Sequence, residues 1–155
     1  MDQLKELRDV LGCPCLGIRR ATRRITQLYD NVLAPSGLTA NQFGQLAHLL
    51  AADFTGTGGL SIGTMADRLG TDPTTLNRNL KPLEAKGFVR DVPSGSDGRV
   101  RTIKITEKGK RTLQRALPLW RQARDQVEKA LGSMELAALS ELLDLATARI
   151  VFSNA

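Results

Sequence analysis

Hydrophobic residues recur along most of the chain at the spacing of an α-helix. In residues 14–34 they fall three and four positions apart, with arginines on the opposite side, as in an amphipathic helix with a basic back. The apolar positions are Ile18, Ala21, Ile25, Leu28 and Val32, and the arginines are Arg19, Arg20, Arg23 and Arg24. Residues 40–52 repeat the pattern after Thr39 and Gln42, which have capping-box spacing. The pattern therefore predicts two helices in this part of the chain.

Two shorter helical patterns follow, separated by only a few residues. Ser61 is placed to cap the first helix, and Gly70 can end it in the left-handed conformation. The second, which Thr71 or Asp72 can cap, begins at Pro73, a residue that suits the first helical position. Two helices joined by so short a turn are typical of a helix-turn-helix unit.

The pattern then changes to runs rich in β-branched residues, at 88–92 and 99–106. They flank the loop sequence PSGSDG, which predicts a two-stranded hairpin with a mobile tip. After the hairpin, a long helix is expected from Thr106 to about residue 131, with a kink at Pro118, and a last helix is expected with Ser133 as its N-cap. In the long helix the residues expected to face inward are Leu113, Leu117, Trp120, Val127 and Leu131. In the last helix an apolar stripe is formed by Leu136, Leu139, Leu143, Ala146 and Ile150.

This order predicts a mainly α fold with a two-stranded β-wing, in a single domain over residues 1–155. A winged helix-turn-helix lobe is expected at 36–109, with dimerisation helices at 1–35 and 110–155. The apolar stripes at 18–32 and 136–150 are more than the lobe needs to cover its own core. A symmetric partner would cover them. The sequence therefore predicts a homodimer.

Composition points to a polyanionic partner. The 155 residues carry a formal net charge of +6, and clustered Lys and Arg neutralise phosphates and release their counterions. No apolar run approaches the roughly 18 residues of a membrane span, and the start, MDQLKELRDVLG, is too charged for a secretory signal. We therefore expect a cytoplasmic protein that does not engage a membrane.

The second helix of the helix-turn-helix has two different faces. Leu76, Leu80 and Leu83 share a narrow arc that would dock on the domain. The other side carries groups that read base edges or clamp phosphates in a major groove, and an amide pairs well with adenine. The candidate DNA-binding residues here are Thr74, Thr75, Asn77, Arg78 and Lys81. The alternative interpretation is an ordinary polar helix face.

The hairpin adds a second candidate contact with DNA. In a winged helix the hairpin tip extends to the flanking backbone or minor groove, so Arg99 and Arg101 are expected to reach DNA, with Ser94 beside them. Asp97, two positions before Arg99, can pair with that guanidinium and aim it. The alternative is a solvent-exposed turn with an incidental ion pair of ~0–1 kcal/mol.

At these residues the chain resembles the MarR (multiple-antibiotic-resistance regulator) family of transcription factors. The resemblance rests on MADRLGTDPTTLNRNLKPLEAKGFV, on the wing pattern DGR and on IKITEKGK. It implies a dimeric DNA-binding regulator, with Arg99 entering the minor groove, Asp97 orienting it, and a recognition helix at 73–86. The chain departs from the family pattern at Pro82, inside that helix, and at Ile105, where the family often has Leu.

These features predict a sequence-specific regulator of transcription, a repressor released from a pseudo-palindromic operator by a small-molecule effector or by thiol oxidation. The alternatives are a winged-helix module for protein interaction and an architectural DNA binder without sequence preference. The chain has no Gly-rich phosphate loop, no Gly-x-Ser-x-Gly and a single histidine, so we expect no enzyme and no cofactor.

Four residues are candidates for sensing a signal. Cys13 and Cys15 flank a proline that can begin a helix, and they can act as an oxidant sensor or simply pack as small apolar residues. With one histidine they are too few for a zinc site, so no metal is expected. Tyr29 and His48 are packing residues or part of an effector pocket between the first helices and the DNA-binding lobe.

Overall fold

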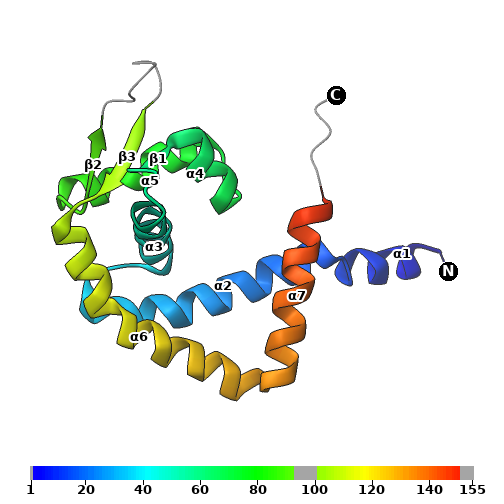
Figure 1. The fold of residues 1–155 in the computed structure, drawn as a ribbon. Helices are drawn as coiled ribbons and strands as arrows, with labels where there is room; N and C mark the ends of the chain where they lie inside the picture. Colours follow the sequence, from blue (N-terminus) through cyan, green and yellow to red (C-terminus); the bar gives the residue numbers. More distant parts are fainter. Residues whose placement is uncertain (1, 93–100, 151–155) are drawn as a thin grey trace.

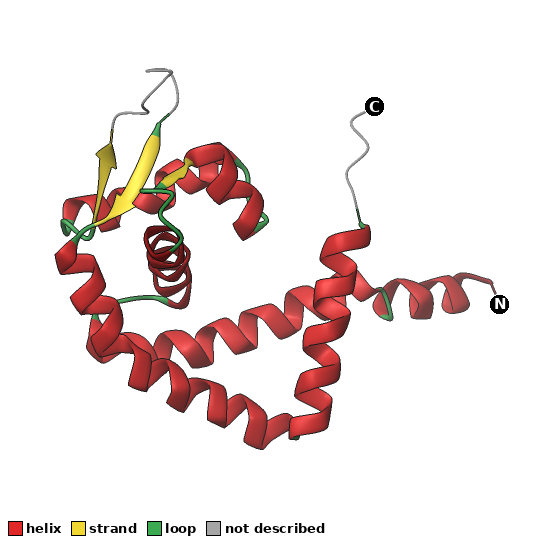
Figure 2. Cartoon of the chain, viewed as in Figure 1, coloured by secondary structure: helices red, strands yellow, loops and turns green. Residues whose placement is uncertain are grey.

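The structure, a computed structural model, describes residues 2–92 and 101–150 (Figure 1). A small sheet lies at one end of a mainly helical molecule (Figure 2). The elements are α1 (Asp2–Leu11), α2 (Pro14–Leu33), the 3-10 helix η1 (Ala34–Ser36), α3 (Ala40–Phe54), β1 (Leu60–Ser61), α4 (Ile62–Leu69), α5 (Pro73–Ala85), β2 (Val89–Val92), β3 (Thr102–Ile105), α6 (Glu107–Leu131) and α7 (Ser133–Arg149).

The first helix, α1, was not predicted from the sequence. Its leucines stand three and four positions apart, at Leu4, Leu7 and Leu11, but the charged residues between them obscure this spacing. All three leucines are exposed, and Figure 1 shows α1 extending away from the rest of the chain. The next helix, α2, begins at Pro14 as expected.

Side-chain caps begin the helices of the lobe, as predicted. Thr39 and Gln42 form the complete capping box of α3, and the Ser61 hydroxyl accepts a hydrogen bond from the backbone N–H of Thr64. At α5 the cap is Asp72 rather than Thr71, because an Asp72 carboxylate oxygen accepts from the Thr75 N–H at 2.8 Å.

The sheet has three antiparallel strands in the order β1-β3-β2, so the predicted two-stranded hairpin is incomplete. Within the hairpin, β2 pairs with β3 so that Val89 lies opposite Ile105 and Arg90 lies opposite Lys104. The added strand, β1, pairs Leu60 with Ile103. A two-residue strand is too short to show alternation, which is why the sequence did not reveal it.

The core of the lobe forms where α3, α4, α5 and the sheet meet. The three leucines predicted to dock the recognition helix, Leu76, Leu80 and Leu83, are all 0% exposed. On α4, Ile62, Met65 and Ala66 are buried and Leu69 is partly buried. These side chains fix the orientation of α5 and leave its opposite face exposed.

The long helix α6 packs along α2 and α3, as Figure 1 shows. Its N-cap is Thr106, as expected, and its predicted inward residues Leu113 and Val127 are buried. Leu131 was predicted to face inward but is 44% exposed. The helix continues through Pro118, and the kink there stays a prediction.

The last helix, α7, departs most from expectation. Its N-cap is Gly132, and the Ser133 hydroxyl donates to Glu128 Oε1 at 2.8 Å, so Ser133 as the cap was wrong. Its stripe is only partly covered within this chain: Leu143 is 43% and Ile150 72% exposed. None of the helices in residues 2–92 and 101–150 is long and apolar enough to cross a membrane.

Candidate nucleic-acid interface

The outer face of α5 carries the predicted polar residues. Thr74, Arg78 and Lys81 are exposed, whereas Thr75 and Asn77 are partly buried. Pro82 lies inside α5 without ending it, and the helix continues to Ala85. Three residues predicted to lie at the wing tip, Ser94, Asp97 and Arg99, fall outside the described residues.

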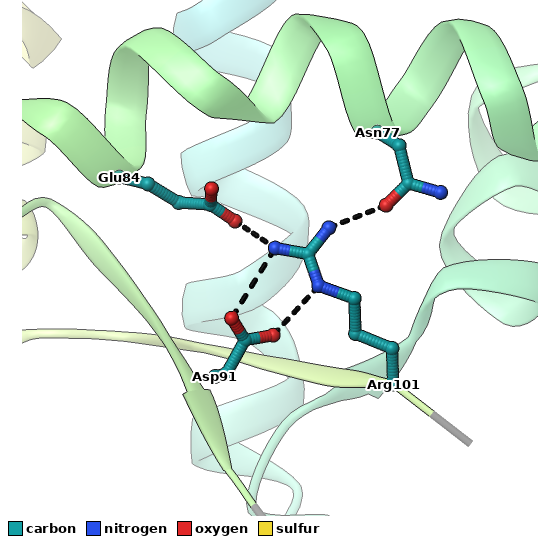
Figure 3. Close-up of polar contacts among 4 residues, drawn as sticks. All are labelled: Asn77, Glu84, Asp91 and Arg101. Carbon is teal, nitrogen blue, oxygen red and sulfur yellow. Dashed lines mark hydrogen bonds and ion pairs between the residues drawn. The ribbon is translucent and has the colours of Figure 1, made fainter. Parts of the chain in front are cut away.

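Arg101, directly before β3, is described, and its side chain is held within the chain (Figure 3). Its Nε donates to Asp91 Oδ1 at 2.7 Å, and its Nη2 donates to Asp91 Oδ2 at 3.3 Å. The same Nη2 donates to Glu84, and Nη1 donates to the side-chain oxygen of Asn77. We call these four residues the Arg101 cluster.

The cluster joins the wing to the recognition helix. Asp91 comes from β2, Arg101 from the start of β3, and Asn77 and Glu84 from α5. The hydrogen bond to Asp91, followed by the nearby charge of Glu84, raises the pKa of Arg101 against the opposing effect of desolvation. One cation facing two carboxylates gives the cluster a net negative charge.

Asn77 and Arg101 were predicted from the sequence as site residues, whereas Glu84 and Asp91 were not. The strand register partly indicates that Asp91 lies near Arg101. Asp91 is opposite Ile103 on the paired strand, and Ile103 is two residues from Arg101. Nothing in the sequence brings Glu84 to the same point, since that requires the packing angle between α5 and the sheet.

A cavity of about 540 Å³ lies between α2, α3 and α6 and contains both Tyr29 and His48. Its walls are mostly apolar, formed by Ile25, Thr26, Tyr29, Leu33, Ala40, Phe43, Gly44, Ala47, His48, Ala51 and Trp120. Burial raises the pKa of Tyr29, with an opposing effect from Arg124, so the phenol is protonated at neutral pH. The sequence did not identify Phe43 and Trp120 as lining residues, because the walls come from three separate helices.

The two cysteines lie at the start of α2. Cys13 occupies the N-cap position and is partly buried, while Cys15 in the first turn is exposed. Pro14 between them does begin the helix, as predicted, and both thiols are free.

Comparison with known proteins identifies relatives of this arrangement. The sequence model described as MarR family matches residues 36–100. The HTH-type transcriptional regulator TtmR of Methylorubrum extorquens (strain PA1) is 33% identical over 96 residues. That match covers 62% of this chain and 47% of TtmR, so the chain aligns with about half the length of this relative.

Two solved structures match over most of both chains. The M. tuberculosis transcriptional regulator MosR in complex with DNA is 35% identical with a TM-score of 0.69, and the match covers 89% of this chain and 99% of MosR. The transcriptional repressor CouR, bound to a 23-mer DNA duplex, is 28% identical with a TM-score of 0.76, and the match covers 88% and 94%.

Proposed function

Because this chain belongs to the MarR family of transcriptional regulators, we propose that it is a cytoplasmic, homodimeric repressor that binds a specific operator sequence in double-stranded DNA. The single observation that carries the proposal is the exposed polar face of α5, beside the wing of a basic chain. Thr74, Arg78 and Lys81 project from this face. MosR and CouR, its relatives of similar fold, have been solved with DNA.

In this proposal α5 enters the major groove and the wing follows the flanking DNA. Arg78 and Lys81 bind base edges or phosphates, and the hydroxyls of Thr74 and Thr75 add short-range hydrogen bonds. At the wing, Arg99 enters the minor groove or binds phosphate, oriented by Asp97 and flanked by Ser94. Arg101 supports the wing from its base through its contacts with Asp91 and Glu84.

Exposed apolar side chains support the homodimer. Leu4 and Leu7 of α1 are 71% and 53% exposed, and Leu142 of α7 is 63% exposed. A second copy of the chain would bury these stripes around a twofold axis. Two recognition helices about 34 Å apart would then read a pseudo-palindrome with half-sites ~10 bp apart, centre to centre.

Two routes of release from the operator are proposed, namely ligand binding in the cavity and oxidation of the thiols. The cavity lies between the helices assigned to dimerisation and the lobe, so an apolar effector with one polar group for Tyr29 or His48 would act on the angle between them. Oxidation of Cys13 and Cys15, at the start of α2, is the second proposed route.

A competition shift assay tests the proposal. The purified protein should bind duplex from upstream of its own gene at least 10³-fold more tightly than random duplex, as specific regulators typically do. Equal binding to both duplexes would support an architectural protein, and binding to neither would support a protein-interaction module. Arg99→Ala should weaken operator binding and reduce the slope of log affinity against log salt by ~1 for each phosphate that the variant no longer neutralises.

A further inference from the structure

The donors of Arg101 determine the orientation of the Asn77 amide in the Arg101 cluster. A guanidinium has only donors, so the Asn77 atom that Arg101 Nη1 contacts must be the carbonyl oxygen. The amide NH2 group then points away from Arg101, as Figure 3 shows. The carbonyl oxygen of Asn77 therefore faces Arg101, and its two donor hydrogens are directed elsewhere.

Arg101 is itself held on several sides, so it cannot easily turn to free the amide. Asp91 accepts from both Nε and Nη2, and Glu84, about two helical turns from Asn77 on α5, also accepts from Nη2. The backbone is fixed too, because the Arg101 carbonyl oxygen accepts from the N–H of Ile62 at 3.1 Å. Only one orientation of the planar guanidinium satisfies both carboxylates and the amide.

We infer that Arg101 is a positioning residue that turns the NH2 donors of Asn77, rather than its carbonyl oxygen, toward the base. The inference rests on the proposed function, in which α5 enters the major groove. A free asparagine pairs with adenine through both its acceptor and its donor, whereas the carbonyl oxygen of Asn77 is directed at Arg101. Guanine, with its two acceptors O6 and N7, and thymine, with O4, fit this group best. Adenine offers the acceptor N7 beside an amino group that the NH2 of Asn77 cannot pair with, and the amino group of cytosine does not fit.

The charge of the cluster supports this role over direct phosphate binding. Arg101 is neutralised by two carboxylates within hydrogen-bonding distance, and its side chain is only 36% exposed. A phosphate approaching the guanidinium would meet Glu84 and Asp91 as well. Arg101 therefore contributes to recognition through Asn77, in contrast to the direct contact expected from the sequence.

The experiment compares the affinities of each protein for operators that differ at one base pair. A loss of affinity that is equal for all sequences therefore does not affect the result. Operators carrying each of the four base pairs at every half-site position are titrated against the wild type, Asn77→Ala, Arg101→Met and the double variant. Asn77→Ala identifies the position that Asn77 reads, where the wild type should prefer guanine or thymine over cytosine by about tenfold. Arg90→Met, at an exposed side chain on the same wing, is the matched control and should keep this preference.

Arg101→Met should reduce the discrimination at that position to the level of Asn77→Ala, and the double variant should equal either single variant. Full discrimination in Arg101→Met, a further loss in the double variant, or a wild-type preference for adenine or cytosine would overturn the inference alone. A wild type that prefers no operator over random duplex would overturn the proposed function itself.

A second variant covers the case in which Arg101→Met fails to fold, judged by circular dichroism and thermal unfolding. Arg101→Lys keeps the positive charge for Glu84 and Asp91 but lacks the planar fork that reaches all three partners. It should still lose most of the discrimination. A folded Arg101→Lys protein with wild-type discrimination would overturn the inference.

Discussion

The ring of Trp120 stacks on the ring of Phe43, with centroids 6.0 Å apart and planes only 4° apart. Phe43 belongs to α3 and Trp120 to α6, and both line the cavity that contains Tyr29 and His48. The stack therefore joins the lobe to the long helix at the wall of the proposed effector pocket. A ligand that enters the cavity must contact these rings.

Trp120 is the single tryptophan of the chain, so its fluorescence reports on this cavity. An apolar effector should change the emission of Trp120 and lower operator affinity over the same concentration range. Gly44→Leu provides a blocked cavity, because Gly44 lines it and an added Cβ would meet nothing within 4 Å. Gly63→Leu, on α4 with similar open space, is the control. An emission change of equal size and midpoint in Gly44→Leu would place the effector elsewhere.

Substitutions at Leu80 and Arg78 should have different effects, the first on stability and the second on DNA binding. Leu80 is 0% exposed, so Leu80→Ala should lower the free energy of unfolding by roughly 2–5 kcal/mol through a core cavity. Arg78 is exposed, and Arg78→Ala should change that free energy by less than about 0.5 kcal/mol while weakening operator binding. Urea denaturation and the shift assay measure the two effects. A large loss of stability in Arg78→Ala would show that this side chain packs.

Gly109, in the IKITEKGK segment, should be required by packing. A Cβ there would lie 2.9 Å from Ile105 Cγ1 and would overlap the carbonyl oxygen of Phe88, which already accepts from the Thr106 N–H. Gly109→Ala should therefore lower the melting temperature, although alanine favours a helix by about 1 kcal/mol. Gly44→Ala, where a Cβ meets nothing within 4 Å, should raise it. Equal shifts in both variants would refute the packing explanation.

Asp53 joins α3 to β3 and α6 through two lysines, and this should make stability depend on pH. Its carboxylate oxygens lie 2.5 Å from Lys110 Nζ and 3.0 Å from Lys104 Nζ. The hydrogen bond from Lys110, then that from Lys104, lowers the pKa of Asp53 below its ordinary 3.8. Hydrogen bonds to Asp53 and Glu107 raise the pKa of Lys110 above 10.5.

The signs of these two shifts define the pH range. A lowered Asp53 pKa gives stability that is present above about pH 3.8 and lost as the pH falls further. A raised Lys110 pKa gives stability that is present below about pH 10.5 and lost as the pH rises further. The contribution of this ion pair to the urea midpoint should thus be constant between these limits, and Asp53→Asn should weaken the decline at both ends. A decline of unchanged size in Asp53→Asn would assign it to other groups.

Local signals in the sequence predicted most of the helices correctly. Thr39, Ser61 and Thr106 act as caps because a hydroxyl that satisfies an N–H three residues ahead depends only on nearby chain. The buried arc of α5 was equally readable, since a helical period determines which side chains share a face. Ser133 was predicted to cap α7, but the cap is Gly132, and the Ser133 hydroxyl donates to Glu128 instead.

Contacts between distant segments were not predictable from the sequence. Asn77 and Arg101 are 24 positions apart, and their hydrogen bond depends on how α5 packs against the sheet. The cavity depends in the same way on the positions of α2, α3 and α6. Leu131 was expected to face inward because its spacing fits the helical period, but periodicity does not say whether the same chain covers the residue.

Cys13 and Cys15 provide the last prediction, which concerns oxidation. The exposed Cys15 lies in the first turn of α2, at the positive end of its dipole, with Arg19 and Arg20 one to two turns further on. A thiolate attacks peroxide, becomes a sulfenic acid and releases hydroxide. The sulfenic acid then condenses with a second thiol, which releases water and forms a disulfide.

Side chains two positions apart on a helix point about 200° away from each other, so the disulfide should join two chains. Mild peroxide should then give a covalent dimer on non-reducing gels together with lower operator affinity. Cys13→Ser with Cys15→Ser should show neither change, while each single variant identifies the thiol that reacts first. The variant proteins should bind untreated operator like the wild type, because neither residue lies on the proposed DNA-binding face. If peroxide lowers the affinity of wild type and double variant equally, or forms no covalent dimer and leaves affinity unchanged, the thiols are packing residues. Release from the operator would then depend on a ligand in the cavity beside Trp120.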